Sequence, residues 1–100
     1  MIRNELAIGG VITTIDTLRF TPAGVLLLSF SLAHVSRQHE AGHERSVTLD
    51  LSVLVLGDLA REMAGLAQST AIVVRGFLAR RSLKSSSVVL HATAYKIELE

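Results

Sequence analysis

Apolar and polar residues alternate with a period of two along most of this chain, which is the pattern of β-strands that bury one face. The alternation changes to helical spacing between residues 57 and 68, where Leu59, Met63 and Leu66 recur at intervals of four and three. Asp58 is the expected N-cap of this short helix. The strands predicted by the alternation cover residues 5–18, 25–37, 46–53, 70–81 and 88–99.

Turn residues indicate how the strands connect. Pro22 presets one turn dihedral and Gly24 accepts a positive one, so the chain is expected to reverse between the first two strands. The polar residues 38–44 are expected to connect the second strand to the third. The pair Gly9 and Gly10 is expected to form a bulge that bends the first strand.

Three strands, a short helix and a two-stranded hairpin are the order of the OB-fold, a five-stranded Greek-key barrel. We therefore expect an all-β protein with one helix between its third and fourth strands, the alternative being an unrelated small barrel or sandwich. With 100 residues, of which 49% are hydrophobic, the chain is expected to be one domain over residues 1–100. OB-folds bind oligonucleotides on the face of strands two and three.

The composition excludes several kinds of site and predicts where in the cell the protein works. It has no Cys, which excludes disulfides, thiolate zinc sites and cysteine nucleophiles. No apolar run approaches the ~18 residues that suggest a membrane span, and Glu5 interrupts what would be the apolar core of a signal peptide. The expected protein is soluble and cytoplasmic.

The pentapeptide His39-Glu40-Ala41-Gly42-His43 matches the zinc-protease signature H-E-x-x-H. That chemistry requires a helix that places both histidines on one face. Here the motif falls at the expected tip of a β-hairpin and contains a glycine that weakens a helix, so a chance match is the expected reading. No enzyme activity, metal or cofactor is predicted. A zinc hydrolase built on His39, Glu40 and His43 is the rival, and it predicts bound metal.

Charge is distributed unevenly along the chain, although the net charge is only +1. No Asp or Glu occurs from residue 63 to residue 97, a stretch with a charge of +5. Arg80, Arg81 and Lys84 are expected on the last hairpin, where mobile cations meet phosphates without desolvating a core. On an OB-fold, this arrangement favours binding of single-stranded DNA. The other two cations of the stretch are Arg75 and Lys96.

Aromatic residues are few for a protein of that class. Stacking on aromatic side chains contributes ~1–3 kcal/mol per base in single-strand binders, and this chain has four aromatic residues and no Trp. Phe30 and Phe77 are expected in the core, and His34 and His91 are expected to be half-buried strand residues. Binding is therefore expected to depend on charge and to weaken as salt rises.

Several short segments of the chain together resemble a known protein family, although each segment alone is too short to indicate one. They are Gly10-Val11, Leu18-Arg19, Thr21-Pro22-Ala23-Gly24, Phe30-Ser31-Leu32-Ala33-His34, Ser36-Arg37-Gln38, Glu40-Ala41-Gly42, Arg45, Val74-Arg75-Gly76-Phe77 and Val89-Leu90-His91-Ala92. Over nearly the whole chain they resemble the primosomal replication protein N (PriB) family, small bacterial OB-fold proteins of the replication-restart primosome. The resemblance implies a non-enzymatic homodimer that binds single-stranded DNA and contacts the restart helicase PriA and, in some bacteria, DnaT.

The resemblance also implies a binding site. Thr48 stands where some members carry a stacking Trp, and His43 replaces an aromatic residue near the second hairpin tip. Both differences argue against tight DNA binding, and the alternative is a protein-interaction module with little or no DNA affinity. The residues expected to contact single-stranded DNA across strands two and three are Arg19, Arg37, His43, Arg45, Thr48, Arg80, Arg81 and Lys84.

Overall fold

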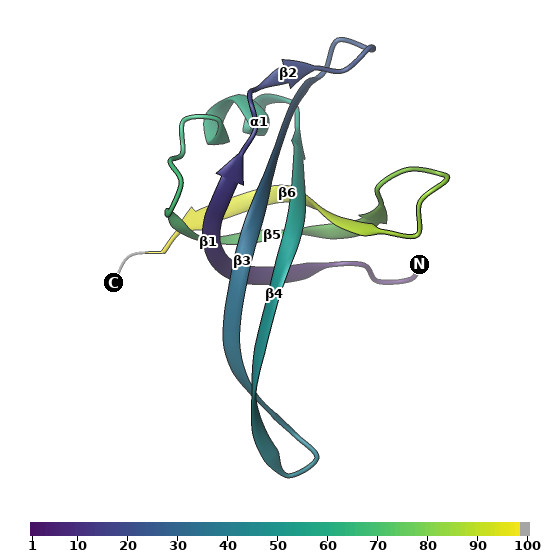
Figure 1. The fold of residues 1–100 in the computed structure, drawn as a ribbon. Helices are drawn as coiled ribbons and strands as arrows, with labels where there is room; N and C mark the ends of the chain where they lie inside the picture. Colours follow the sequence, from purple (N-terminus) through teal and green to yellow (C-terminus); the bar gives the residue numbers. More distant parts are fainter. Residues whose placement is uncertain (99–100) are drawn as a thin grey trace.

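A computed structural model describes residues 1–98, in which strands predominate (Figure 1). Residues 99 and 100, the end of the last expected strand, lie outside the described residues. The elements are β1 (Leu6–Ile15), β2 (Arg19–Phe20), β3 (Leu26–Glu40), β4 (His43–Leu56), α1 (Asp58–Met63), β5 (Ala71–Arg80) and β6 (Val88–Ile97).

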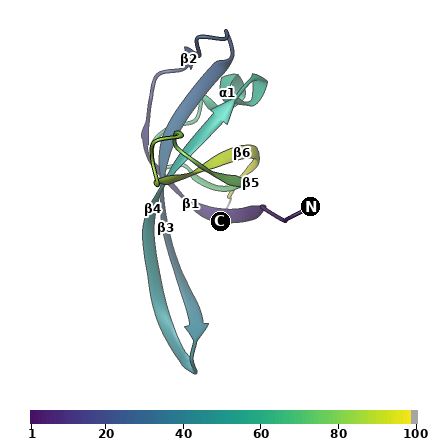
Figure 2. The same cartoon turned by 90° about the vertical axis from the view of Figure 1, so that its right-hand side faces the viewer.

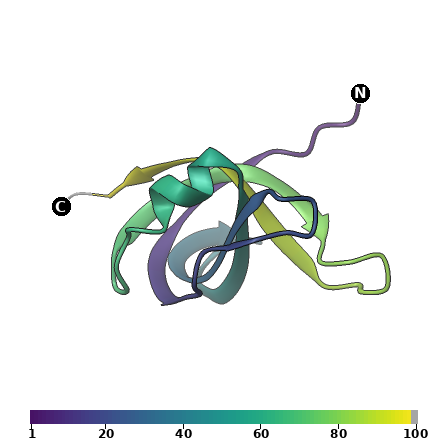
Figure 3. The same cartoon turned by 90° about the horizontal axis from the view of Figure 1, so that it is seen from above.

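The five long strands close into a barrel. Strand β1 pairs with both β5 and β3, β5 pairs with β6, and β4 pairs with β3 and, in parallel, with β6. The short β2 adds to the edge of β3, and α1 lies across one end of the barrel (Figure 3). The predicted OB-fold, with one short helix between the third and fourth long strands, is confirmed.

Alternate strand residues fill the barrel. Between residues 26 and 33 of β3, the even-numbered residues are buried and the odd-numbered ones are half-buried, as the period of two requires. Phe30 is buried as predicted, and burying a large apolar side chain of this kind stabilises the fold by roughly 1.5–3 kcal/mol. The largest fully buried side chains are Ile12, Leu28, Leu32, Val53, Val55, Met63, Ile72, Val74, Val89 and Leu90.

Strand β1 changes partner along its length. Its first half pairs with β5 and its second half with β3, and the register shifts between Ile12 and Thr14. The bulge expected at Gly9 and Gly10 is therefore wrong. Gly10 serves a close approach instead, because a Cβ there would lie 2.4 Å from the carbonyl oxygen of Ala33.

Helix α1 and the β3–β4 turn also depart from expectation. The N-cap is Gly57, at φ 80°, with no side-chain capping bond, so the predicted cap at Asp58 is wrong. Asp58 is instead the first helical residue, where its charge faces the positive end of the helix dipole. No helix within residues 1–98 has the length and apolar character needed to cross a membrane.

The connection between β3 and β4 is shorter than the polar linker expected over residues 38–44. The turn consists of Ala41 and Gly42, both at positive φ (54° and 80°). Two such residues match the twist of the flanking strands, so pairing continues to Glu40 and His43 at the tip. Residues 34–49 form a two-stranded ribbon, here called the arm, that extends far from the barrel (Figures 1 and 2).

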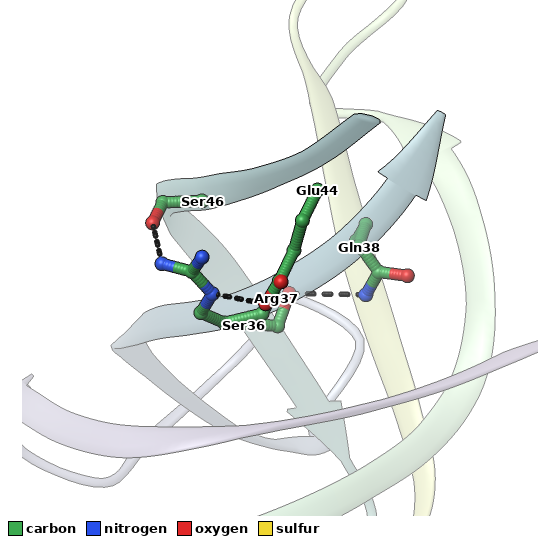
Figure 4. Close-up of polar contacts among 5 residues, drawn as sticks. All are labelled: Ser36, Arg37, Gln38, Glu44 and Ser46. Carbon is green, nitrogen blue, oxygen red and sulfur yellow. Dashed lines mark hydrogen bonds and ion pairs between the residues drawn. The ribbon is translucent and has the colours of Figure 1, made fainter. Parts of the chain in front are cut away.

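His34 joins the base of the arm to β1. Its Nδ1 lies 2.7 Å from the carbonyl oxygen of Gly9, and its Nε2 lies 2.8 Å from Ser36 Oγ. Because a carbonyl oxygen only accepts hydrogen bonds, Nδ1 is the donor to Gly9. In the neutral ring, Nε2 then accepts from the Ser36 hydroxyl, which in turn accepts from the Gln38 amide at 3.1 Å (Figure 4).

Candidate nucleic-acid interface

Strands β3 and β4 present one continuous face to the outside. Their register runs without a shift from Leu27 opposite Leu56 to Glu40 opposite His43, and residues opposite one another share a face of the ribbon. Since the even-numbered residues of β3 enter the core, its odd-numbered residues point away from it. We call the outer face the set Leu27, Ser29, Ser31, Ala33, Val35, Arg37 and His39 of β3 with Glu44, Ser46, Thr48, Asp50, Ser52, Leu54 and Leu56 of β4.

This outer face is long, and five of its fourteen residues carry a hydroxyl group. From Leu27 to His39 it spans about 40 Å, at roughly 3.3 Å per residue. In the half of the face nearer Leu27 is a hollow of about 120 Å³, the serine hollow, which Arg81 of the β5–β6 loop helps to line. The carboxylate of Asp16 lies there too and accepts a 2.7 Å hydrogen bond from Ser29. The remaining lining residues are Thr14, Phe30, Ser31, Ser52, Val53 and Leu54.

The structure brings four of the eight expected contact residues to this face. Arg19 pairs opposite Leu27 and so lies at one end of the face. Arg37 and Thr48 lie toward the tip of the arm, and Arg81 lies between the two ends, in the serine hollow.

Arg80 and Lys84 belong to the hairpin that carries Arg81. Arg80 is the last residue of β5, and its Nη1 donates a 3.4 Å hydrogen bond to the carbonyl oxygen of Leu83. Lys84 is exposed in the loop, which projects from the side of the barrel (Figures 1 and 3). The three cations therefore share one short segment beside the outer face.

His43 and Arg45 lie on the opposite face of the arm. They stand across from Glu40 and Gln38, whose even numbers place them on the other side of β3. The structure therefore separates these two expected contacts from Arg37 and Thr48. A single extended strand lying on one face of the arm does not reach both groups.

Two ion pairs hold the arm, one on each face. On the outer face, Arg37 Nε lies 2.6 Å from Glu44 Oε1, and its Nη1 donates to Ser46 Oγ at 3.2 Å (Figure 4). On the opposite face, Arg45 Nη1 lies 2.9 Å from Glu40 Oε1. All four charged side chains are exposed, and exposed pairs are worth only about 0–1 kcal/mol, so a phosphate can replace either carboxylate at little cost.

The zinc-protease signature lacks the geometry it needs. Residues 39–43 form the end of β3, a tight turn and the start of β4, rather than a helix. His39 is on the outer face and His43 on the opposite one, so their rings point apart. Within residues 1–98, no three His, Cys, Asp or Glu side chains are grouped so as to hold a metal ion.

One aromatic pair was not foreseen from the sequence. Phe77, expected in the core, is 39% exposed, and its ring stacks on that of His91 with centroids 5.0 Å apart and an interplanar angle of 4°. The two residues face each other in the β5–β6 register. The strands approach closely beside them, because a Cβ on Gly76 would lie 1.8 Å from the His91 carbonyl oxygen.

Comparisons with known proteins agree with this architecture. A family model described as another single-strand binding protein family matches residues 4–94. The replication restart protein PriB of Bordetella pertussis is 40% identical over 88 residues, which are 88% of this chain and 82% of that protein. The structure of PriB from Ralstonia solanacearum superposes with a TM-score of 0.90 at 26% identity, covering 98% of this chain and all of that one. The single-stranded DNA binding protein of Thermus aquaticus has a TM-score of 0.79 at 27% identity, covering 97% of this chain and 50% of that one.

Proposed function

This chain belongs to the PriB family of replication restart proteins, and on that premise we propose that it is a non-enzymatic accessory protein of the replication-restart primosome that holds single-stranded DNA along its outer face. The observation that carries the proposal is the alignment of Arg19, Arg81 and Arg37 along one face of the β3–β4 ribbon.

The chemistry of this face suits a flexible polyanion. Guanidinium groups bind phosphate oxygens strongly and in a fixed geometry. Hydroxyl groups, here those of Ser31 and Ser52 in the serine hollow, donate to phosphate and sugar oxygens, contacts that position a strand without reading its sequence. The expected binding is therefore tolerant of sequence. Three phosphate contacts predict a slope of about −2 for log affinity against log salt on a single strand.

The decisive experiment compares two arginines of the same arm. Arg37 lies on the outer face and Arg45 on the opposite one, and each has one carboxylate partner. Fluorescence anisotropy of labelled oligodeoxythymidine, over a salt series, should show weaker binding for Arg37→Ala and a shallower salt slope. Arg45→Ala removes the same charge from the other face and should bind like the unaltered protein. Equal losses would contradict a site confined to the outer face and support the wider set that includes Arg45 and His43.

The cationic hairpin tests the rival reading, an OB-fold module that binds only proteins. Replacing Arg80, Arg81 and Lys84 together with Ala should abolish oligonucleotide binding if the proposal holds. Absence of any binding by the unaltered protein at low salt would support the rival instead.

The proposal includes a homodimer and contact with the restart helicase PriA and, in some bacteria, DnaT, as the family resemblance implies. Exposed apolar residues on the arm support a protein contact: Val35 is 73% exposed and Leu49 is 40% exposed, on opposite faces of the ribbon. Light scattering at micromolar concentration tests the dimer, which a strictly monomeric mass would contradict. Co-sedimentation with purified helicase tests the second contact.

A further inference from the structure

The stacked rings of Phe77 and His91 line an apolar hollow that borders the outer face. The hollow has a volume of about 310 Å³ and is lined chiefly by Leu54, Leu56, Leu59, Phe77, His91 and Thr93, none of which carries a formal charge when the imidazole is neutral. The side-chain polar groups among the lining residues are the ring nitrogens of His91 and the hydroxyl of Thr93. Aromatic and aliphatic side chains with a few polar groups among them suit a molecule that has an apolar face and polar substituents.

Leu54 joins this hollow to the serine hollow. Leu54 is a lining residue of both, and in the parallel β4–β6 pairing it stands beside His91. A ligand whose charged group meets Arg81 in the serine hollow therefore has the aromatic pair directly next to it. The segment that carries Phe77, His91 and Arg81 contains no acidic residue. The carboxylate of Asp16 also lines the serine hollow, so the Arg81 guanidinium must outweigh its repulsion when a phosphate binds there.

We propose that Phe77 and His91 form a stacking platform for one unstacked base of the single strand whose phosphate lies at Arg81. The inference rests on the proposed function and deepens it, because it supplies an aromatic contact to a site otherwise made of charge and hydroxyl groups. A base fits the observations better than an apolar peptide does. The aromatic pair lies next to the serine hollow with its Arg81, so the expected ligand has an anionic group beside a flat one. Stacking is tolerant of base identity, since every base has a π-face.

The first test separates the base from the backbone. Oligodeoxythymidine and an abasic deoxyribose-phosphate oligomer of the same length carry the same charge, and only the first can stack. Phe77→Leu keeps an apolar side chain at the position and should weaken binding of oligodeoxythymidine roughly tenfold or more while leaving the abasic oligomer unchanged. Arg81→Ala should weaken binding of both. Urea unfolding of Phe77→Leu checks that the variant is folded.

A second test uses the absence of Trp from the chain. In Phe77→Trp the indole is the single Trp fluorophore, and stacking of a base on it should quench its emission when oligodeoxythymidine is added, but not when the abasic oligomer is added. The matched control is Ile97→Trp, at a position that is 42% exposed. Ile97 lies six residues beyond His91 on β6, which is about 20 Å along the strand. Its emission should not respond to either oligomer.

The outcomes distinguish this inference from the proposed function. Selective loss by Phe77→Leu together with quenching of Phe77→Trp supports the platform. Equal loss for both oligomers, or quenching at neither position, overturns the platform and leaves the charge-based site intact. No binding of either oligomer by the unaltered protein overturns both. If Phe77→Leu binds DNA normally but converts a dimer to a monomer in light scattering, a second copy covers the hollow, and the platform is likewise refuted.

Discussion

Arg37 and Glu44 form a close ion pair on the outer face of the arm, with 2.6 Å between Nε and Oε1. In the proposed site this pair must open before the guanidinium can bind a phosphate, so Glu44 acts as an internal competitor for DNA. Its counterpart on the opposite face is Glu40, which pairs with Arg45. The side chains of the two pairs have similar exposure, which makes each pair a control for the other.

Replacing Glu44 with Gln should strengthen binding of single-stranded DNA. The substitution releases Arg37 and removes one negative charge from the face, and since exposed pairs are worth about 0–1 kcal/mol, the expected gain is up to roughly fivefold. Glu40→Gln changes the net charge equally but frees Arg45 on the opposite face, so it should give a smaller gain. Anisotropy titrations at low salt measure the difference, and identical gains would show that only net charge matters.

Adding a methyl group at Gly10 should destabilise the protein. The new Cβ would lie 2.4 Å from the Ala33 carbonyl oxygen and 2.8 Å from Leu32 Cγ, so backbone must shift, at a cost of about 1–3 kcal/mol. At Gly9 the nearest atom would be Val73 Cγ2 at 3.6 Å, an ordinary contact. Urea unfolding should therefore show a lower midpoint for Gly10→Ala and little change for Gly9→Ala. A similar effect at both positions would refute the close approach of β1 to β3.

Removing the imidazole of His34 should loosen the base of the arm. The Gly9 carbonyl would lose its 2.7 Å donor in a partly buried place, and leaving such a group unpaired costs about 1–3 kcal/mol. His34→Ala should lower the free energy of unfolding by that amount and speed amide exchange at the start of the arm. His39→Ala, on an exposed strand position, should change neither; a matching loss there would point to a general effect of removing histidine.

Alkaline pH should destabilise the fold through Tyr95. Burial raises the pKa of the Tyr95 phenol, and a hydrogen bond and the charge of Glu62 raise it further. A folded pKa above the unfolded value of about 10 means that the stability linked to the protonated phenol is complete below pH ~10 and is lost as pH rises through the folded pKa. Tyr95→Phe should remove this contribution to the pH dependence.

The same residue allows a direct titration, because Tyr95 is the chain's one tyrosine. Near-ultraviolet absorbance of the phenolate should give a midpoint above that of the unfolded chain. Glu62→Gln should lower the midpoint only in part, since burial is the larger cause. A midpoint equal to that of the unfolded protein would contradict the burial of this ring.

The alternation of residue types was enough to predict the five long strands and their order along the chain, because it records directly which side chains enter a core. It did not predict the two-residue strand β2. The faces of the arm were not predictable in the same way. Whether Arg45 joins Arg37 or points away from it depends on the register of the hairpin, which a turn of two residues fixes and a linker over residues 38–44 would have left open. The zinc-like signature misled for the same reason, since spacing alone does not separate a helix from the tip of a ribbon.

The aromatic pair marks another limit of sequence reasoning. Phe77 and His91 are far apart along the chain, and their stacking depends on a register shift between Arg75 and Gly76 in the β5–β6 pairing. A strand residue beside a glycine carries no local signal of whether it faces inward. The N-cap of α1 was also missed. Capping preferences favoured the side chain of Asp58, but the N-cap residue has a positive φ, which glycine adopts readily, and it is Gly57.

The arm also has an energetic consequence for whatever binds it. Within residues 1–98, no third strand flanks its ladder from Val35–Thr48 to the tip, and a two-stranded hairpin is only marginally stable in water. This ribbon should therefore fray at its free end far more often than the cylinder opens. A ligand lying along it must hold the two strands together as well as bind them. Part of the binding free energy is therefore spent on ordering the protein, and a stiffer tip would bind more tightly without a single added contact.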